Sequence, residues 1–166
     1  VASTSMAFTA LRADGTVATW GDAEIGGDNR EVRDQLRDVQ KVASTSMAFT
    51  ALRADGTVVS WGQRELGGDS SNVQDLLQDV LEIKASVLGS AFAAILSNGS
   101  VITWGDEISG GDSSSVQDQL QDVRKMEASG AAFAAVRADG GLVTWGDPQS
   151  GGDSSDVSDQ LQTLLS

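Results

Sequence analysis

The chain has 166 residues, of which 24 are acidic and 11 basic, and its formal net charge is −13. This excess of carboxylates argues against nucleic acid or an anionic membrane surface as a partner, because both need clustered Lys and Arg. The chain has no Cys and no His, which excludes disulfides, thiolate metal sites and Cys nucleophiles and removes the commonest general base.

One stretch of sequence, Ala7 to Asp22, recurs as Ala48 to Gln63, Ala91 to Asp106 and Ala132 to Asp147. Its four Phe are 41, 43 and 41 residues apart, its four Trp have the same spacing, and each Phe precedes its Trp by 12 residues. One such stretch cannot bury both of its faces, so the period predicts a repeat protein in which neighbouring units stack on each other.

The first unit opens with a short strand, Val1 to Ser5, and continues with two apolar runs that flank Asp14-Gly15. Such a pattern predicts a tight β-hairpin with Gly at positive φ, and we expect a type I′ turn. The later units have Asp55-Gly56, Asn98-Gly99 and Asp139-Gly140 at this position.

The hydrophobic period then changes, because Val32, Leu36 and Val39 are spaced i, i+4, i+7, as on one face of a helix. Asp28 with Glu31 matches a capping box. The same stripe and a similar start recur in the other units, so the sequence predicts four helices, near 29–40, 70–81, 113–124 and 154–165.

The predicted fold is therefore an α+β repeat protein of one domain, 1–166, with four strand–hairpin–helix units of about 41 residues. The units are 1–41, 42–83, 84–126 and 127–166. Two extra residues near Val87 to Ser90 predict a bulge or a longer turn before a strand. The chain begins inside a repeat, at Val1, as we expect of a fragment or a processed form.

The run Ala48 to Gly62, with its Asp55-Gly56 turn and its Trp61-Gly62 end, resembles the repeat of the regulator of chromosome condensation family (RCC1-like). It also looks like the related bacterial propeller that inhibits β-lactamases. The family usually has a His before the first hairpin strand, and a Gly-Gln-Leu-Gly segment that forms another strand. Here there is no His, and Gly67-Gly68 leads into the predicted helix.

The resemblance implies a propeller-like arrangement, closed or nearly closed, in which a helix replaces the fourth strand of each blade. The alternative is an open α/β solenoid. The tract from Trp104-Gly105-Asp106 to Ser114 is also similar to uncharacterised repeat proteins of marine algae. That similarity would imply a source but no activity. If it holds, a chloroplast location and an accessory role in a large, photosynthetic assembly are alternatives.

The tryptophans are the first candidate site. As a row of aromatic anchors they would bind a protein partner or a sugar. Alternatively, each packs at the junction between units and donates its N–H to a backbone carbonyl. One Trp per unit at a fixed offset favours packing. The four residues are Trp20, Trp61, Trp104 and Trp145.

Acidic residues beside the glycine-rich turns are the second candidate, since such carboxylates can hold Ca²⁺ or act as a hydrolytic pair. Their pattern lacks the dense Asp/Gly alternation of calcium loops, and capping of the helices explains most of them. The set is Asp22, Asp28, Asp69, Asp106, Asp112, Asp147 and Asp153. The Gly-Gly pairs are poor phosphate cradles, because no Lys follows them.

We also expect Arg12, Arg53 and Arg137, each two residues before a hairpin Asp, to pair with acidic residues of a neighbouring helix. The favoured function is a non-catalytic module that binds or scaffolds a protein through an acidic, Trp-bearing surface, without a cofactor or metal. The rivals are an accessory subunit of a large assembly, and a calcium-dependent carbohydrate-binding protein or hydrolase that uses the Asp-rich turns.

Overall fold

The computed structural model describes residues 1–161 and shows four three-stranded antiparallel sheets, each built from consecutive strands. The first sheet contains β1 (Ala2–Ser3), β2 (Ala7–Leu11) and β3 (Val17–Gly21), and the second contains β4 (Val39–Ser44), β5 (Ala48–Arg53) and β6 (Val58–Gly62). The third contains β7 (Val80–Ser86), β8 (Ala91–Leu96) and β9 (Val101–Gly105), and the fourth contains β10 (Val123–Ala128), β11 (Ala132–Arg137) and β12 (Leu142–Gly146).

Two short helical turns follow the last strand of each sheet. The first of the two comes directly after the strand: η1 (Ala23–Gly27), η3 (Arg64–Leu66), η5 (Glu107–Gly111) and η7 (Pro148–Ser150). The second of the two comes a few residues later: η2 (Arg33–Gln35), η4 (Gln74–Leu76), η6 (Gln117–Gln119) and η8 (Ser155–Gln160). None of these helices among the described residues is long and apolar enough to cross a membrane.

The predicted helices 29–40, 70–81 and 113–124 are wrong. Each range contains only a three-residue helical turn and then enters a strand, β4, β7 or β10. The residue before each strand has a positive φ that a helix does not allow, namely 54° at Asp38, 53° at Asp79 and 54° at Asp122. In the fourth range, 154–165, the structure has the six-residue turn η8, and residues 162–165 lie outside the described part of the chain.

The hairpins form where they were predicted, with Gly15, Gly56, Gly99 and Gly140 at φ of 78–84°. The turn type is different from the expected I′, because only the Gly has positive φ. The Gly15 N–H donates to Arg12 O, and the Arg12 N–H donates to Thr16 O. This is a three-residue loop with Gly in the left-handed position of a bulge.

The extra two residues of the third unit lie in a longer turn between β7 and β8. Ser86 pairs with Ala91, and the residues between them form the turn, with Ser90 at a φ of 63°. A register shift also occurs near the start of β4, β7 and β10, each time one residue after the first.

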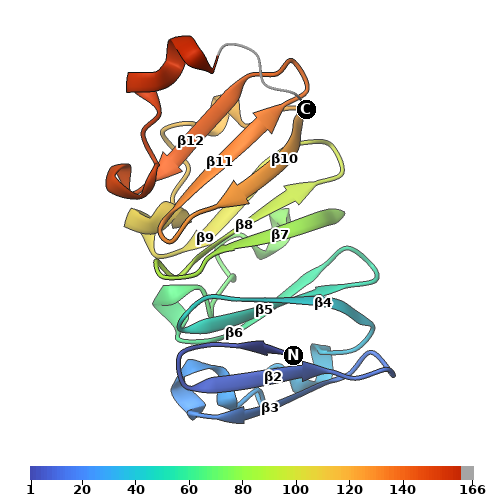
Figure 1. Ribbon diagram of the computed structural model, residues 1–166. Helices are drawn as coiled ribbons and strands as arrows, with labels where there is room; N and C mark the ends of the chain where they lie inside the picture. The colour runs from blue at the N-terminus through green and yellow to red at the C-terminus, as the bar shows by residue number, and fades with distance from the viewer. Residues whose placement is uncertain (162–166) are drawn as a thin grey trace.

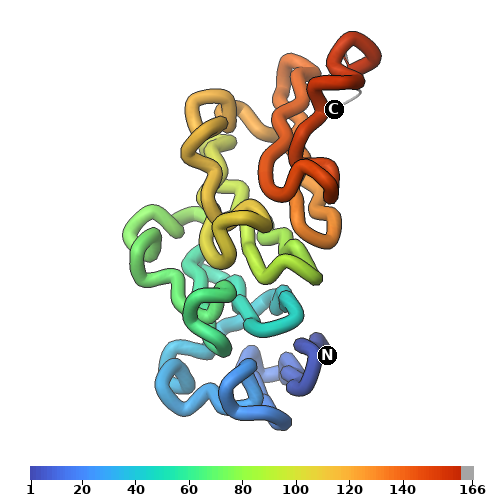
Figure 2. The backbone as a smooth tube through the Cα atoms, turned by 90° about the vertical axis from the view of Figure 1, so that its left-hand side faces the viewer, coloured from blue at the N-terminus to red at the C-terminus, as the bar shows by residue number. Residues whose placement is uncertain are grey.

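The four sheets follow one another in a stack, and the first and fourth lie at opposite ends (Figures 1 and 2). The closed ring that we expected is therefore not formed by the described residues, which make an open, propeller-like arc. The core lies between successive sheets, in three clusters that each combine residues of two neighbouring units. Leu36, Leu77 and Leu120 of the predicted stripes are buried in these clusters, although no helix carries them.

Candidate functional site

An aromatic pair marks the same place in every hairpin. Phe and Trp stand directly opposite each other on neighbouring antiparallel strands, as Phe8 and Trp20 do on β2 and β3. Their rings stack with centroids 5.3–5.5 Å apart and interplanar angles of 18–28° in all four units. The other pairs are Phe49–Trp61, Phe92–Trp104 and Phe133–Trp145.

The glycine-rich turn of the preceding unit covers three of these pairs. At the first junction, Trp61 donates its Nε1–H to Gly26 O over 3.1 Å, and a Cβ on Gly26 would lie 2.5 Å from Cδ2 of Phe49. Trp145 makes the same bond to Gly110 O. Glycine is required at this turn for its positive φ and for the close approach of the ring.

The second junction lacks this hydrogen bond. Trp104 is only 5% exposed, and its Nε1 is a buried donor for which the described residues provide no acceptor. The turn before it is also different, because Gln63 stands where Asp22 and Asp106 cap the first and third turns. Because an unsatisfied buried donor costs free energy, we expect this junction to be weaker than the other two.

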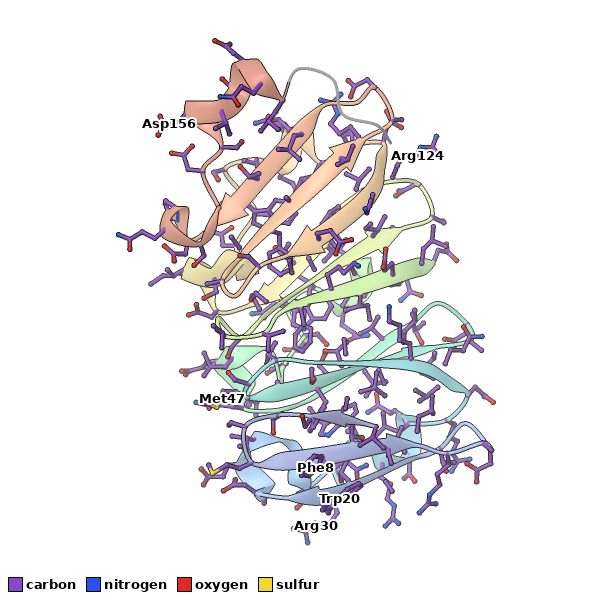
Figure 3. The ribbon with its side chains drawn as sticks, viewed as in Figure 1. Phe8, Trp20, Arg30, Met47, Arg124 and Asp156 are labelled. Atoms are coloured by element: carbon purple, nitrogen blue, oxygen red, sulfur yellow. The ribbon has the colours of Figure 1, made fainter. Side chains whose placement is uncertain are left out.

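The four tryptophans are therefore not equivalent. Trp61, Trp104 and Trp145 are 3–5% exposed and belong to the core clusters, so most of each side chain is inaccessible to a partner. Trp20 is 49% exposed and Phe8 is 47% exposed, and both lie on the end sheet of the stack (Figure 3). Partner binding through an exposed Trp remains a prediction for Trp20 alone.

The conspicuous Asp residues organise the turns themselves. Asp28, Asp69, Asp112 and Asp153 each accept the N–H of the residue two positions on. Asp22 and Asp147 cap η1 and η7 in the same way, and Asp106 caps η5 through the N–H of Ser109. These side chains cap local turns rather than the long helices that we predicted.

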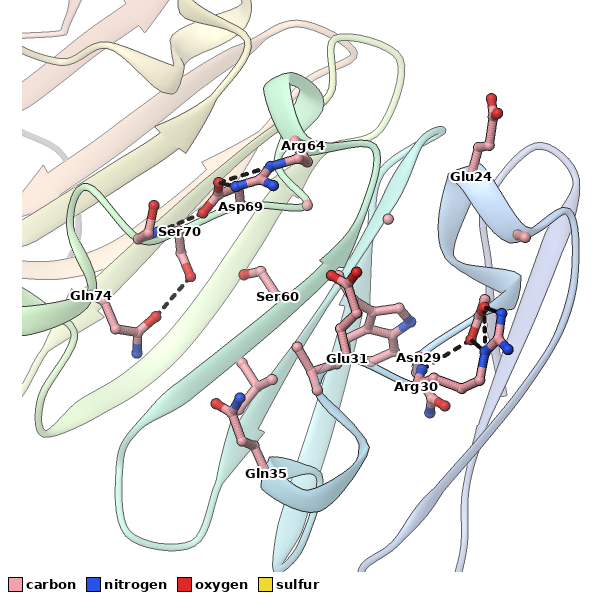
Figure 4. A pocket seen from close by; sticks show the side chains of 18 residues that line it. Glu24, Asn29, Arg30, Glu31, Gln35, Ser60, Arg64, Asp69, Ser70 and Gln74 are labelled. Carbon is pink, nitrogen blue, oxygen red and sulfur yellow. Dashed lines mark hydrogen bonds and ion pairs between the residues drawn. The ribbon is translucent and has the colours of Figure 1, made fainter.

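Local hydrogen bonds lower the pKa of Asp69 and Asp28. The pKa of Asp69 is lowered to about 2, first by the Ser71 N–H, then by the Ser71 side chain and the Arg64 guanidinium. Hydrogen bonds from Arg30 lower the pKa of Asp28. Ion pairs join both couples, at 2.6 Å for Arg30–Asp28 and 2.8 Å for Arg64–Asp69 (Figure 4).

A calcium or hydrolytic site would need several of these carboxylates to converge. Within residues 1–161, no group of three or more acidic side chains is placed to hold a metal ion. The carboxylates are spread over successive turns, and each accepts hydrogen bonds from its own turn, so the geometry gives no support to a calcium site.

The hairpin arginines also differ from their expected role. Arg53 pairs with Asp55 at 3.4 Å and Arg137 with Asp139 at 2.9 Å, so each contacts the Asp of its own hairpin rather than a neighbouring helix. These pairs are partly solvent-exposed and contribute little to stability.

Two grooves lie between the outer loops of neighbouring units. The first has a volume of about 560 Å³ and contains Glu31, Ser60 and the Arg64–Asp69 pair (Figure 4). The second has a volume of about 860 Å³ and is lined by Leu76, Ile102 and the edge of Trp104, beside acidic residues. Both are open and mixed in polarity.

A further exposed surface lies at the end of β7. Val87 is 57%, Leu88 80% and Ile108 75% exposed. The β7–β8 turn is fixed against two neighbours: Leu88 and Gly89 donate their N–H groups to Gly130 O, and Gly89 lies against Ser109 of η5. We call the side chains of Val87, Leu88 and Ile108 the apolar loop edge. Beyond the two-residue insertion, no feature of the sequence predicts this surface.

No protein-family model and no curated protein matches this chain. Several solved structures share its fold. Human WBSCR16 matches with a TM-score of 0.56 and 19% identity, over 85% of this chain and 45% of that one. Prp20p of Saccharomyces cerevisiae, characterised with its binding to Gsp1p and histones, matches with a TM-score of 0.54 and 18% identity, over 85% and 43%.

The ectodomain of the Physcomitrella patens receptor kinase CR4 matches with a TM-score of 0.53 and 19% identity, over 87% of this chain and 39% of that one. The chain thus spans less than half the length of these proteins. At these identities the likeness concerns the fold, and the resemblance to the RCC1-like repeat is confirmed at that level. The described residues form four blade-like units whose fold is similar to that of these solved structures.

Proposed function

We propose that the chain is a non-catalytic protein-binding or scaffolding module. The observation that carries the proposal is the apolar loop edge, where Val87 and Leu88 of the β7–β8 turn and Ile108 of η5 are each more than half exposed. The β7–β8 turn is held in place by its hydrogen bonds to Gly130 O. Exposed apolar groups on a rigid support are typical of protein interaction sites.

The charge of the chain indicates the character of the partner. With a net charge of −13 and Glu107 beside Ile108, the surface would favour a partner with an apolar centre and a basic rim. Opposite charges speed the encounter, while the apolar contact supplies most of the affinity. The similar protein Prp20p binds Gsp1p and histones, which supports protein binding as a use of this fold.

The test is to compare the proteins that co-purify with the parent chain and with Leu88→Ser/Ile108→Ser from extracts of its source. We expect the double variant to lose one or more specific partners and to keep the melting temperature of the parent, because both side chains are exposed. Leu81→Ser is the matched control. Leu81 is 65% exposed and lies near the opposite end of β7 from the loop edge.

A second measurement distinguishes specific binding from general stickiness. The partner of the parent should bind in a 1:1 ratio, more weakly at high salt, and Leu81→Ser should bind it equally well. If Leu88→Ser/Ile108→Ser retains every partner at parental affinity, the loop edge is not the binding surface and the proposal fails.

A further inference from the structure

The two ends of the stack have complementary surfaces. At one end, the Phe8–Trp20 pair has the same stacking as the covered pairs, with centroids 5.5 Å apart, but no described residue covers it. At the other end, the fourth unit has the glycine turn that covers such a pair elsewhere, but no aromatic pair lies against it among the described residues. A Cβ on Gly151 would have no described atom within 4 Å, whereas the equivalent Gly26 and Gly110 touch a Phe ring.

The uncovered turn already has the conformation of the covered turns. Gly151 has φ 99° and ψ 10°, close to φ 97° and ψ 11° at Gly110, which is packed against Phe133. The Gly151 turn needs no neighbour to adopt this shape. A preformed surface binds with a smaller loss of conformational entropy.

A second apolar group lies exposed beside this turn. In the first three units a Val packs against the core cluster that contains the next Phe–Trp pair, and these residues are Val32, Val73 and Val116. Their equivalent in the fourth unit is Val157, which is 41% exposed. The fourth unit therefore presents both elements, the Gly turn and the Val, that bury an aromatic pair at the internal junctions.

We propose that two copies of this chain associate head to tail, with Phe8 and Trp20 of one copy packed on the Gly151–Val157 surface of the other. The internal junctions predict the contacts: Trp20 Nε1 donates to the Gly151 carbonyl, as Trp61 does to Gly26 O, and Phe8 lies on the Gly151 Cα. The interface is heterologous, so it makes a closed ring if its rotation closes and a filament if it does not.

Sedimentation velocity from about 1 μM to about 1 mM protein tests the proposal over the range of weak and moderate affinities. We expect the parent to form dimers or larger species as the concentration rises, with a blue shift of Trp20 fluorescence. Trp20→Ala and Val157→Asp should each weaken self-association about ten-fold or more, since each removes one side of the interface. Leu81→Ser, altered away from both ends, should associate like the parent.

Mixing the two variants distinguishes a head-to-tail interface from a symmetric dimer interface. Trp20→Ala retains an intact fourth unit, and Val157→Asp retains an intact first unit, so the mixture should form a 1:1 complex that neither variant forms alone. Both altered side chains are exposed, so circular dichroism and melting should match the parent.

Two results would overturn the proposal. One is a parent chain that stays monomeric throughout the concentration range. The other is a Val157→Asp variant that associates as strongly as the parent, because this would mean that the Phe8–Trp20 faces of two copies pair with each other. Neither result depends on the apolar loop edge, so this inference and the proposed function can fail separately.

Discussion

The pairs Phe8–Trp20 and Phe49–Trp61 are the same structure in two environments. Their centroids are 5.5 and 5.4 Å apart, yet Phe8 is 47% exposed and Phe49 is fully buried. The stacking is thus set inside the hairpin, by the register that places Phe opposite Trp. About half of the burial of such a pair comes from its own unit, and the preceding unit supplies the rest. The junctions between units therefore contribute much of the stability of this protein.

The largest effect that this comparison predicts concerns the tryptophans. Trp61→Ala should lower the free energy of unfolding by about 3–5 kcal/mol, because it leaves a cavity at a junction and an unpaired Gly26 carbonyl. Trp20→Ala should cost about 1 kcal/mol or less in the monomer. Chemical denaturation at low protein concentration measures both, and equal losses would contradict the assignment of burial to the junction.

The sequence predicted the hairpins well, because local chemistry determines them. Asp-Gly or Asn-Gly between apolar runs needs a turn with positive φ, and the Phe and Trp positions follow from its register. The packing of Trp61 and Trp145 with N–H bonds to backbone carbonyls was one of the two alternatives considered, and the structure has it. The turn subtype was wrong, since Asp14 uses its carboxylate to accept from Thr16 rather than adopting positive φ.

The helices failed for a physical reason. The spacing of Val32, Leu36 and Val39 fits a helix, but a helical turn followed by a kink and a strand buries the same three positions. Asp38 produces the kink at φ 54°, which Asp tolerates better than most residues. The run after it, Val39 to Ser44, forms β4 although only Val39 and Val42 in it are β-branched.

The open ends of the arc could not be predicted from the repeat. Identical units give identical expectations for Trp20 and Trp61, and only the three-dimensional arrangement distinguishes the end unit from an inner one. The apolar loop edge was also beyond the sequence, because nothing local separates an exposed Leu88 from a buried Leu77.

Substitutions at Gly26 and Gly151 compare a covered turn with an uncovered one. Gly26→Val and Gly151→Val impose the same backbone strain, since both residues have φ near 100°. Only Gly26 has a Phe ring against its Cα, so its variant should be less stable by a further 1–3 kcal/mol, roughly the cost of overpacking. Thermal or urea unfolding gives the difference. Similar losses in the two variants would mean that the strain, rather than the aromatic contact, requires Gly.

The Trp61 and Trp104 junctions differ in one hydrogen bond, so a comparison of the two predicts a smaller difference in stability. Trp61→Phe removes the bond to Gly26 O, whereas Trp104→Phe removes a donor that has no acceptor among residues 1–161. We expect Trp61→Phe to be the more costly by about 1 kcal/mol, the net value of a typical buried hydrogen bond. An equal or larger cost for Trp104→Phe would show that Trp104 Nε1 is bonded in solution.

The smallest expected effect is a difference in how stability depends on pH between a covered turn and an uncovered one. Asp69 follows the covered Gly67 turn, and its pKa is lowered from 3.8 to about 2 by Ser71 and Arg64. Asp153 follows the uncovered Gly151 turn, and its pKa is lowered by Ser155 alone. A depressed carboxyl pKa stabilises the folded state above the unfolded value, and this stability is lost as the pH falls through the folded value.

The parent should therefore lose stability between about pH 4 and pH 2, the interval between the unfolded and folded pKa values of Asp69. Asp69→Asn should remove less than about 1 kcal/mol of that loss, because the Arg64 side chain is exposed and solvent screens the pair. Asp153→Asn should flatten the profile less, since it has no arginine partner. Urea unfolding across this interval measures all three slopes. If Asp69→Asn loses stability as steeply as the parent, the Arg64–Asp69 pair does not contribute to the folding of its turn.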